Sequence, residues 1–212
     1  MRRTRGAMLG LLAAWPLTGW CAAMDLDALL EHLARPAPAA TPFIEVHFSQ
    51  MLARPLVISG KLEYLGPDSL ARTVEQPYHE RTEIHGDTVT VEREHDKPRQ
   101  FSLKHAPELK SLLGSFAALL SGDRTALRGQ FDLDLQGEGE AWTLGLTPRD
   151  AHVRRRIASI TVIGQGNEPR CLNTREPGDN ATVMLVGPAT QTTLPELPDR
   201  AWLDRQCRGG GH

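Results

Sequence analysis

Apolar and polar residues alternate with a period of two over much of the chain between residues 43 and 186. Near the start of this region, Ile44, Val46 and Phe48 are separated by polar residues. Such alternation is typical of strands with one apolar face and one polar face. Glycine-containing turns separate several of the segments, so the pattern predicts about ten or eleven antiparallel strands. The further strands are predicted at 56–64, 70–75, 79–85, 88–94, 100–103, 131–136, 142–147, 157–165, 170–176 and 182–186.

Other segments carry apolar residues at helical spacing. Four leucines between Asp25 and Pro36 predict a short helix, because Asp favours a helix start and Pro ends a helix. Residues 107–120 hold an apolar stripe that predicts a longer helix, and residues 123–128 predict a shorter one. The basic stretch 149–156 predicts a helical turn. Strands and helices together predict an α+β fold that is mainly β, with helices over one face of a sheet.

Two segments follow neither period. Proline and alanine dominate residues 36–42, which predicts a linker before the first strand. Residues 188–212 are rich in proline, threonine and glycine, and they predict a mobile tail that is ordered only near Trp202 and Cys207. The folded domain is therefore expected to span residues 24–187.

The first residues have the composition of a secretory signal. Three arginines precede an apolar run over residues 7–20, and small residues follow at 21–23. The run of about 14 residues is shorter than the roughly 20 that span a bilayer. We therefore expect a signal peptide over residues 1–23 and a mature chain from Met24, with a membrane anchor as the alternative.

Charge and cysteine content limit the possible binding partners and bear on the compartment in which the protein works. The chain has 24 Lys and Arg against 26 Asp and Glu, and the formal net charge of −2 becomes more negative once the signal arginines are removed. A basic nucleic-acid footprint is therefore absent. Cys171 and Cys207 would pair in an oxidising compartment, with two free thiols as the alternative.

Motifs for common catalytic chemistry are missing from the sequence. His79, His85, His95 and His105 lack the compact spacing of metal ligands. Ser115 falls in a predicted helix without a Gly-x-Ser-x-Gly frame, and the sequence has no phosphate-binding loop. We therefore expect no metal, no cofactor and no enzyme activity, with an enzyme acting on lipid as the alternative.

Several short motifs follow one another in a characteristic order and spacing. They are Phe48-Ser49-Gln50, residues 59–64 with Pro67 and Leu70, Gln76-Pro77, residues 86–89, Leu146-Thr147-Pro148-Arg149 and residues 160–164. In this order they resemble the LolA family of periplasmic lipoprotein carriers, over residues 25–187. The resemblance implies an unclosed antiparallel β-barrel with a helical lid over an apolar cavity.

The resemblance also implies a function and a location. LolA carriers take the acyl chains of a lipoprotein from an inner-membrane donor and pass them to an outer-membrane acceptor. We therefore expect a monomeric carrier in the periplasm of a Gram-negative bacterium, without a nucleic-acid partner. Relatives that sense lipids or lipoproteins supply the alternative, a sensor or interaction module on the same fold.

Two departures from the best-known carriers indicate a divergent branch. Gly66 stands where those carriers have an arginine that latches the lid, and Arg54-Pro55-Leu56 replaces a longer loop. Members of such a branch accompany genes for aryl polyenes and other acyl lipids. The expected cargo is therefore an acylated lipoprotein, a lipid or an aryl-polyene-type molecule.

Two or three helices are too few to fill a strongly curved sheet of this size. We therefore expect an apolar cavity, although a fully packed core fits the same pattern. Leu29 and Leu33 are lid candidates, and Arg54 is expected at a lid carbonyl or a cargo headgroup, or else solvated in its turn. The residues predicted to line the cavity are Phe48, Ile58, Leu62, Tyr64, Phe101, Phe131, Leu133, Trp142, Leu144, Ile160 and Val162 from strands, and Leu112, Leu113 and Phe116 from the long helix.

Overall fold

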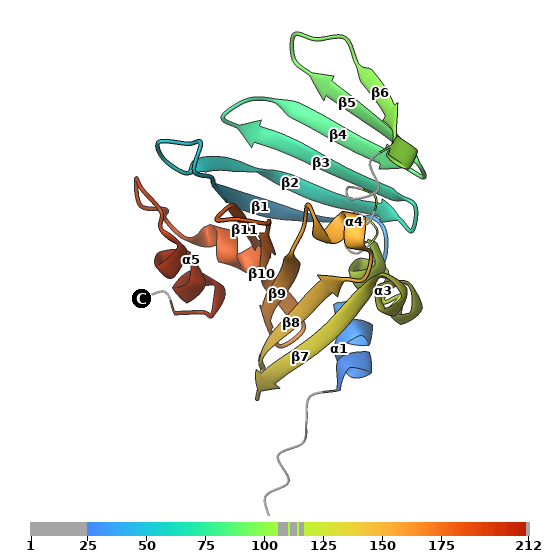
Figure 1. Ribbon diagram of the computed structural model, residues 1–212, viewed down its shortest axis with the longest axis vertical. Helices are drawn as coiled ribbons and strands as arrows, with labels where there is room; N and C mark the ends of the chain where they lie inside the picture. The colour runs from blue at the N-terminus through green and yellow to red at the C-terminus, as the bar shows by residue number, and fades with distance from the viewer. Residues whose placement is uncertain (1–24, 106–109, 111–113, 115–116, 211–212) are drawn as a thin grey trace, which may run out of the picture.

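The computed structural model describes residues 25–105, 110, 114 and 117–210. The expected signal peptide lies outside the described residues, and so do three residues predicted for the cavity, Leu112, Leu113 and Phe116. The described residues form a curved antiparallel sheet with short helices on both of its faces (Figure 1).

Eleven strands form the sheet, in the order β6-β5-β4-β3-β2-β1-β11-β10-β9-β8-β7. All neighbours in this order pair antiparallel. Because β6 and β7 stand at opposite ends of the order, the sheet does not close, and the predicted unclosed antiparallel architecture is confirmed. The strands are β1 (Ala39–Phe48), β2 (Leu56–Gly66), β3 (Ser69–Gln76), β4 (Glu80–His85), β5 (Thr88–Arg93), β6 (Arg99–Ser102), β7 (Phe131–Glu138), β8 (Ala141–Pro148), β9 (Ser159–Gln165), β10 (Glu168–Arg175) and β11 (Ala181–Val186).

The four α-helices whose ends are described are short, and each follows a capping aspartate. Asp25, Asp123, Asp150 and Asp199 accept hydrogen bonds from backbone N–H groups of the first turn, which have no partner within the helix. Among the described residues, no helix is long and apolar enough to cross a membrane. The helices are α1 (Leu26–Leu33), α3 (Arg124–Gln130), α4 (Ala151–Arg154) and α5 (Arg200–Cys207), with 3-10 helices η1 (Leu103–His105) and η2 (Gly187–Gln191).

Strand β1 begins earlier than the sequence pattern predicts. Ala39 pairs with Tyr64 and Pro42 with Lys61 of β2, whereas pairing with β11 on the other side begins only at Phe43. Proline lacks the N–H that a central strand must donate, but a strand edge tolerates it. The prediction of a linker up to Pro42 is therefore wrong from Ala39 onward, because this part of β1 is paired on one side only.

The inner, concave face of the sheet is filled by a hydrophobic core at β7 and β8. Phe131, Trp142 and Leu144 are at most 2% exposed, and they belong to one cluster with Leu30 of α1 and Leu127 of α3. Figure 1 shows α1 and α3 beside these strands. Burying a side chain of this size contributes about 1.5–3 kcal/mol, so this half of the sheet is well stabilised.

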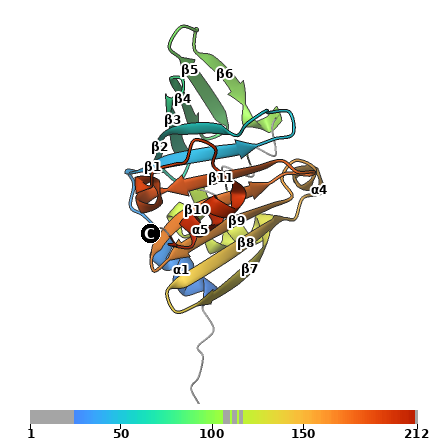
Figure 2. The same ribbon diagram turned by 90° about the vertical axis from the view of Figure 1, so that its left-hand side faces the viewer.

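A second hydrophobic cluster covers the outer face of the central strands. Val46 of β1, Ile163 of β9 and Leu185 of β11 pack with Leu203 of α5. Figure 2 shows α5 in front of these strands, on their outer side. Strand β1 is therefore buried on both faces, since Phe43 belongs to the inner core and Val46 to the outer cluster.

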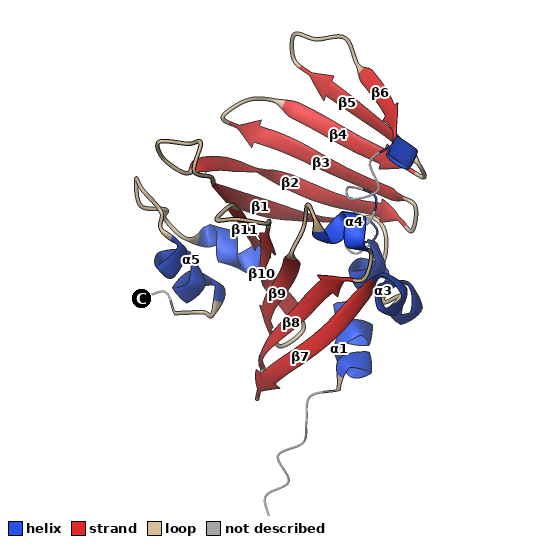
Figure 3. Cartoon of the chain, viewed as in Figure 1, coloured by secondary structure: helices blue, strands red, loops and turns tan. Residues whose placement is uncertain are grey.

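A disulfide and several hydrogen bonds hold the C-terminal segment on the outer face. Cys171 of β10 and Cys207 of α5 form the disulfide. Arg170 donates to the backbone carbonyls of Gln206 and Cys207, at 3.1 and 3.2 Å. The sequence predicted order in this tail only near Trp202 and Cys207. Figure 3 shows that the chain there forms a helix, α5, because the prolines and glycines of the tail flank residues 200–207 and do not interrupt them.

Candidate functional site

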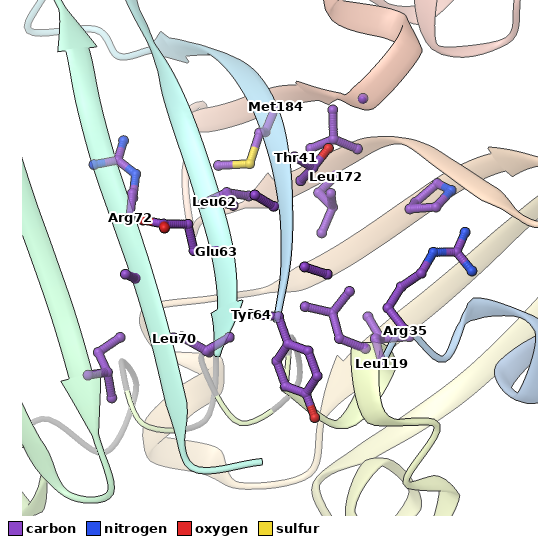
Figure 4. Close-up of a pocket in the computed structure, with 18 of the residues that line it drawn as sticks. Arg35, Thr41, Leu62, Glu63, Tyr64, Leu70, Arg72, Leu119, Leu172 and Met184 are labelled. Atoms are coloured by element: carbon purple, nitrogen blue, oxygen red, sulfur yellow. The ribbon is translucent and has the colours of Figure 1, made fainter. Parts of the chain in front are cut away.

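A cavity of about 650 Å³ lies against the inner face of the half of the sheet that the core does not fill. Figure 4 shows its side chains converging from the sheet on one side and from the helical elements on the other. Most of the wall is apolar. Its larger apolar side chains are Leu62 and Tyr64 (β2), Leu70 (β3), Ile84 (β4), Val89 and Val91 (β5), Phe101 (β6), Val162 (β9), Leu172 (β10), Met184 and Val186 (β11), Leu33 (α1), and Leu119 and Leu120.

The strand register explains why these side chains meet. Tyr64 lies opposite Leu70, Leu70 opposite Ile84, Ile84 opposite Val89, and Val89 opposite Phe101. Directly opposed residues on neighbouring strands project from the same face of a sheet. The five side chains therefore form a continuous apolar row across β2–β6.

Short side chains at the start of β1 leave room beside this row. Ala39, Ala40 and Thr41 line the cavity, and Thr41 and Ala39 lie opposite Leu62 and Tyr64. Larger residues at these positions would occupy part of the space. The segment predicted as a linker thus forms part of the wall.

Arg35 fixes the rim of the cavity next to α1. Its backbone N–H donates to the carbonyl of Leu120 at 2.7 Å, and its guanidinium donates to the carbonyls of His32 and Asn167 at 3.0 and 2.8 Å. These bonds join the end of α1, the helical segment 117–120 and the β9–β10 turn. The rim is therefore held by three separate parts of the chain.

One end of the cavity is polar. Glu45 of β1 and Arg72 of β3 both line it, and Oε2 of Glu45 lies 2.7 Å from Nη2 of Arg72. The other carboxylate oxygen, Oε1, lies 2.6 Å from Nε2 of His47. The Nδ1 atom of His47 lies 3.1 Å from the hydroxyl of Thr182 on β11. The Arg72 guanidinium also lies over the ring of Phe43, 4.9 Å from its centroid.

Glu45 remains ionised at neutral pH despite its burial. Burial disfavours the charged carboxylate and by itself would raise the pKa. The contact with His47 and the positive charge of Arg72 outweigh this effect, so the pKa of Glu45 lies below its ordinary value. The polar end therefore presents a carboxylate and a guanidinium that compensate each other.

The structure divides the strand residues predicted for the cavity into groups. Leu62, Tyr64, Phe101 and Val162 line it, as does the lid candidate Leu33. Arg54 is exposed in the turn between β1 and β2. The remaining inner-face predictions pack in the filled core instead: Ile58, Phe131, Leu133, Trp142, Leu144 and Ile160, together with the lid candidate Leu29.

Phe48 lies on the opposite face from the cavity. It packs with the outer cluster, and the Arg200 guanidinium of α5 lies 5.2 Å from the centroid of its ring. The inner face of β1 is instead formed by Thr41, Phe43 and Glu45, which lie opposite inner-face residues of β2. The alternating apolar residues of β1, such as Val46 and Phe48, lie on the outer face because α5 covers that face.

Sequence reasoning missed much of the wall. Arg72 of β3 lies opposite the predicted Leu62, and Val89 of β5 lies opposite the predicted Phe101. Both wall positions can be derived from strand pairing once the hairpin registers are known. Glu45 lies between Ile44 and Val46, so the alternation in β1 predicts that it is on the polar, solvated face. No sequence signal marks it as buried, because its charge partner lies on β3 and its cover comes from distant strands.

The site has the chemistry of a binding cavity. Among residues 25–105, 110, 114 and 117–210, no group of three or more His, Cys, Asp or Glu side chains could hold a metal ion. A predominantly apolar wall with a few polar groups at one end binds a ligand by burial and orients it by its polar part.

An open antiparallel sheet with helices over an apolar interior cavity defines a class of proteins that hold hydrophobic ligands. The sequence profile of the family described as "outer membrane lipoprotein carrier protein LolA-like" matches residues 18–210. The chain belongs to this family, and the resemblance derived from its motifs is confirmed. No curated protein sequence matches the chain.

Solved structures with a related arrangement share little sequence with the chain. The LolA superfamily protein NE2245 from Nitrosomonas europaea is 12% identical, with a TM-score of 0.44 over 85% of this chain and 98% of its own. LprF from Mycobacterium bovis is 12% identical, with a TM-score of 0.37 over 80% and 95%. MucB in the MucA/MucB complex of Pseudomonas aeruginosa is 15% identical, with a TM-score of 0.39 over 84% and 59%.

Proposed function

We propose that this protein is a periplasmic carrier that binds the acyl chains of lipoproteins or lipids in its apolar cavity and moves them between the inner and outer membranes. The observation that carries the proposal is the cavity of about 650 Å³ with its predominantly apolar wall. Its volume falls within the roughly 300–1,000 Å³ of typical small-molecule sites. Membership of the lipoprotein-carrier family supports the same proposal.

Burial of an acyl chain supplies enough free energy for reversible binding. Each buried methylene group contributes about 0.8 kcal/mol, so about ten of them contribute about 8 kcal/mol. This corresponds to a Kd of about 1 μM before the cost of ordering the chain is subtracted. Binding of this strength needs no covalent step, and it permits release to an acceptor.

The direction of transfer depends on partners of the carrier. We propose an inner-membrane donor that loads the cavity and an outer-membrane acceptor that unloads it. The open edge of the sheet at β6, whose Phe101 lines the cavity, and the helical side of the cavity offer routes by which a chain could enter without crossing a strand. The cargo is an acylated lipoprotein, a lipid or an aryl-polyene-type molecule.

The direct test places a charge in the cavity wall. The Leu70→Glu variant puts a carboxylate among apolar side chains, with Tyr64 and Ile84 directly opposite, so we expect uptake of a fluorescent fatty acid to weaken by at least about tenfold. The matched control is Leu65→Glu, which introduces the same charge on β2 at a side chain that is already 37% exposed. Fluorescence titration of both variants and the wild type measures the effect.

Two outcomes decide the proposal. Weakened uptake in Leu70→Glu alone, with bound lipid found by mass spectrometry in wild-type protein purified from its host, supports an acyl carrier. Wild-type protein that takes up no acyl probe and is recovered without lipid would overturn the proposal.

A further inference from the structure

An ion pair stands inside the wall of a predominantly apolar cavity, whose other charged lining residues are Arg35, Glu63 and Glu168. Glu45 is 7% exposed, and no other polar or charged residue of the described chain is buried to this degree. A buried ion pair loses hydration on both partners, and apolar residues of similar size are often at least as stabilising. Stability alone therefore gives little reason for Glu45 and Arg72 to occupy this position, and a role in ligand binding is the alternative to pursue.

Both carboxylate oxygens of Glu45 already have a partner. One carboxylate oxygen is occupied by Arg72 and the other by His47, at 2.7 and 2.6 Å. His47 is in turn anchored to Thr182 at 3.1 Å. The carboxylate is thus fixed in place and holds the Arg72 side chain along the cavity wall.

Arg72 has donors to spare. A guanidinium carries five N–H donors, and the only side-chain hydrogen bond of Arg72 within the described residues runs from Nη2 to Glu45. Its side chain is 28% exposed and lines the cavity. Its nearest inner-face neighbours across the strands are Leu62 and Thr82, which bring no further charge. Several N–H groups are therefore available to an acceptor on a bound molecule.

The charge balance selects the kind of acceptor. Glu45 already compensates the positive charge of Arg72, so a carboxylate ligand would place a second negative charge beside Glu45 in a poorly hydrated site. A neutral carbonyl oxygen accepts a hydrogen bond from a guanidinium without this repulsion. The site therefore favours an uncharged headgroup over a free acid.

We infer that Arg72, held by Glu45, is a headgroup subsite that donates hydrogen bonds to the carbonyl of an ester- or amide-linked acyl chain. This inference rests on the proposed carrier function and specifies its cargo. Figure 4 shows Arg72 toward one end of the cavity, with Tyr64, Leu70 and Leu119 toward the other. The linkage of the cargo lies at Arg72, and its hydrocarbon chain extends toward those three side chains.

The test compares three ligands of equal chain length as displacers of the fluorescent probe N-phenylnaphthylamine. Methyl laurate has a neutral carbonyl, dodecyl methyl ether lacks the carbonyl, and lauric acid is an anion at neutral pH. The double variant Arg72→Met with Glu45→Gln removes both charges, so that neither partner is left buried and unpaired. The matched control is Lys61→Met with Glu75→Gln, which removes an exposed β2–β3 pair outside the cavity.

In the wild type and the control, we expect methyl laurate to bind about tenfold more tightly than the ether, as one hydrogen bond to a charged donor predicts. The cavity variant should reduce this ratio to about twofold or less while the ether binds as before. An unchanged ratio, or a larger loss for lauric acid than for methyl laurate, overturns the inference and leaves the carrier proposal standing. Failure of all three ligands to displace the probe from wild type, with the probe bound, overturns both.

Discussion

The two halves of the sheet use the same strand pattern for different purposes. At β7 and β8 the inner face is packed by α1 and α3, and Leu144 and Leu146 are fully buried. At β3–β6 the inner face carries Leu70 and Val91, which are only partly buried, beside Ile84 and Val89, which are buried. These side chains face the cavity. The difference lies in what covers each half, because both halves alternate apolar and polar residues in the same way.

This difference separates stability from binding along the sheet. Side chains in the filled half are in contact with other protein atoms all round, so their removal leaves an empty space. Side chains in the open half already face unoccupied space, and their removal changes the shape of the cavity. Variants in the two halves should therefore affect different measurements.

The largest effect is expected from truncating a core leucine. Leu144→Ala should lower the free energy of unfolding by about 2–5 kcal/mol, because it removes a fully buried side chain from the packed half. Leu70→Ala, in the open half, should cost about 1 kcal/mol while weakening binding of an acyl probe. Urea denaturation and probe titration measure the two effects. Equal losses of stability in both variants would contradict the separation.

A somewhat smaller effect is expected on the outer face. The disulfide between Cys171 and Cys207 closes a loop with a sequence separation of 36, so the double Ala variant should lose about 3–4 kcal/mol of stability. Acyl binding should remain near the wild-type level at temperatures where the variant is folded, because α5 lies on the face opposite the cavity. Denaturant unfolding and probe titration check both statements, and a loss of affinity that exceeds the loss of folded protein would show coupling between the faces.

The smallest effect concerns pH and tests the polar end of the cavity. Because the pKa of Glu45 is lowered on folding, its ionisation stabilises the folded state at pH values above its ordinary pKa of about 4.5. This contribution is lost as the pH falls through the lower pKa of the folded state. The stability difference between wild type and Glu45→Gln should therefore stay constant above about pH 4.5 and shrink below it. Unfolding measured along a pH series gives the difference, and a gap that does not change with pH would show that Glu45 gains nothing from its partners.

The arrangement of elements could largely be predicted from the sequence. Strands such as β4 and β5 are local hairpins, and their alternation and turn glycines appear within a short stretch of chain. The start of β1 could not be predicted, because proline at position 42 argues against a strand unless it is known that β11 ends beside Phe43. Helix α5 was missed because it is brief and depends on packing against a distant sheet face.

The site could be predicted only in part, for a related reason. Alternation identifies an apolar face, but it does not show whether helices fill that face or leave it open. Trp142 and Leu62 therefore looked equivalent in sequence, although one packs in the core and the other lines the cavity. Glu45 shows the converse, since a charged residue between apolar ones indicates solvent exposure unless its cross-strand partner is known.

Strands β6 and β7, at the two ends of the strand order, do not pair with each other, and this affects how far the interior of the sheet can widen. A closed barrel ties its diameter to a fixed strand number and stagger, so its interior cannot widen without breaking backbone hydrogen bonds. A sheet with two free edges can change its curvature through small changes in strand twist, while all of its backbone hydrogen bonds between strands are kept. The interior of such an open sheet can therefore adapt to ligands of different width.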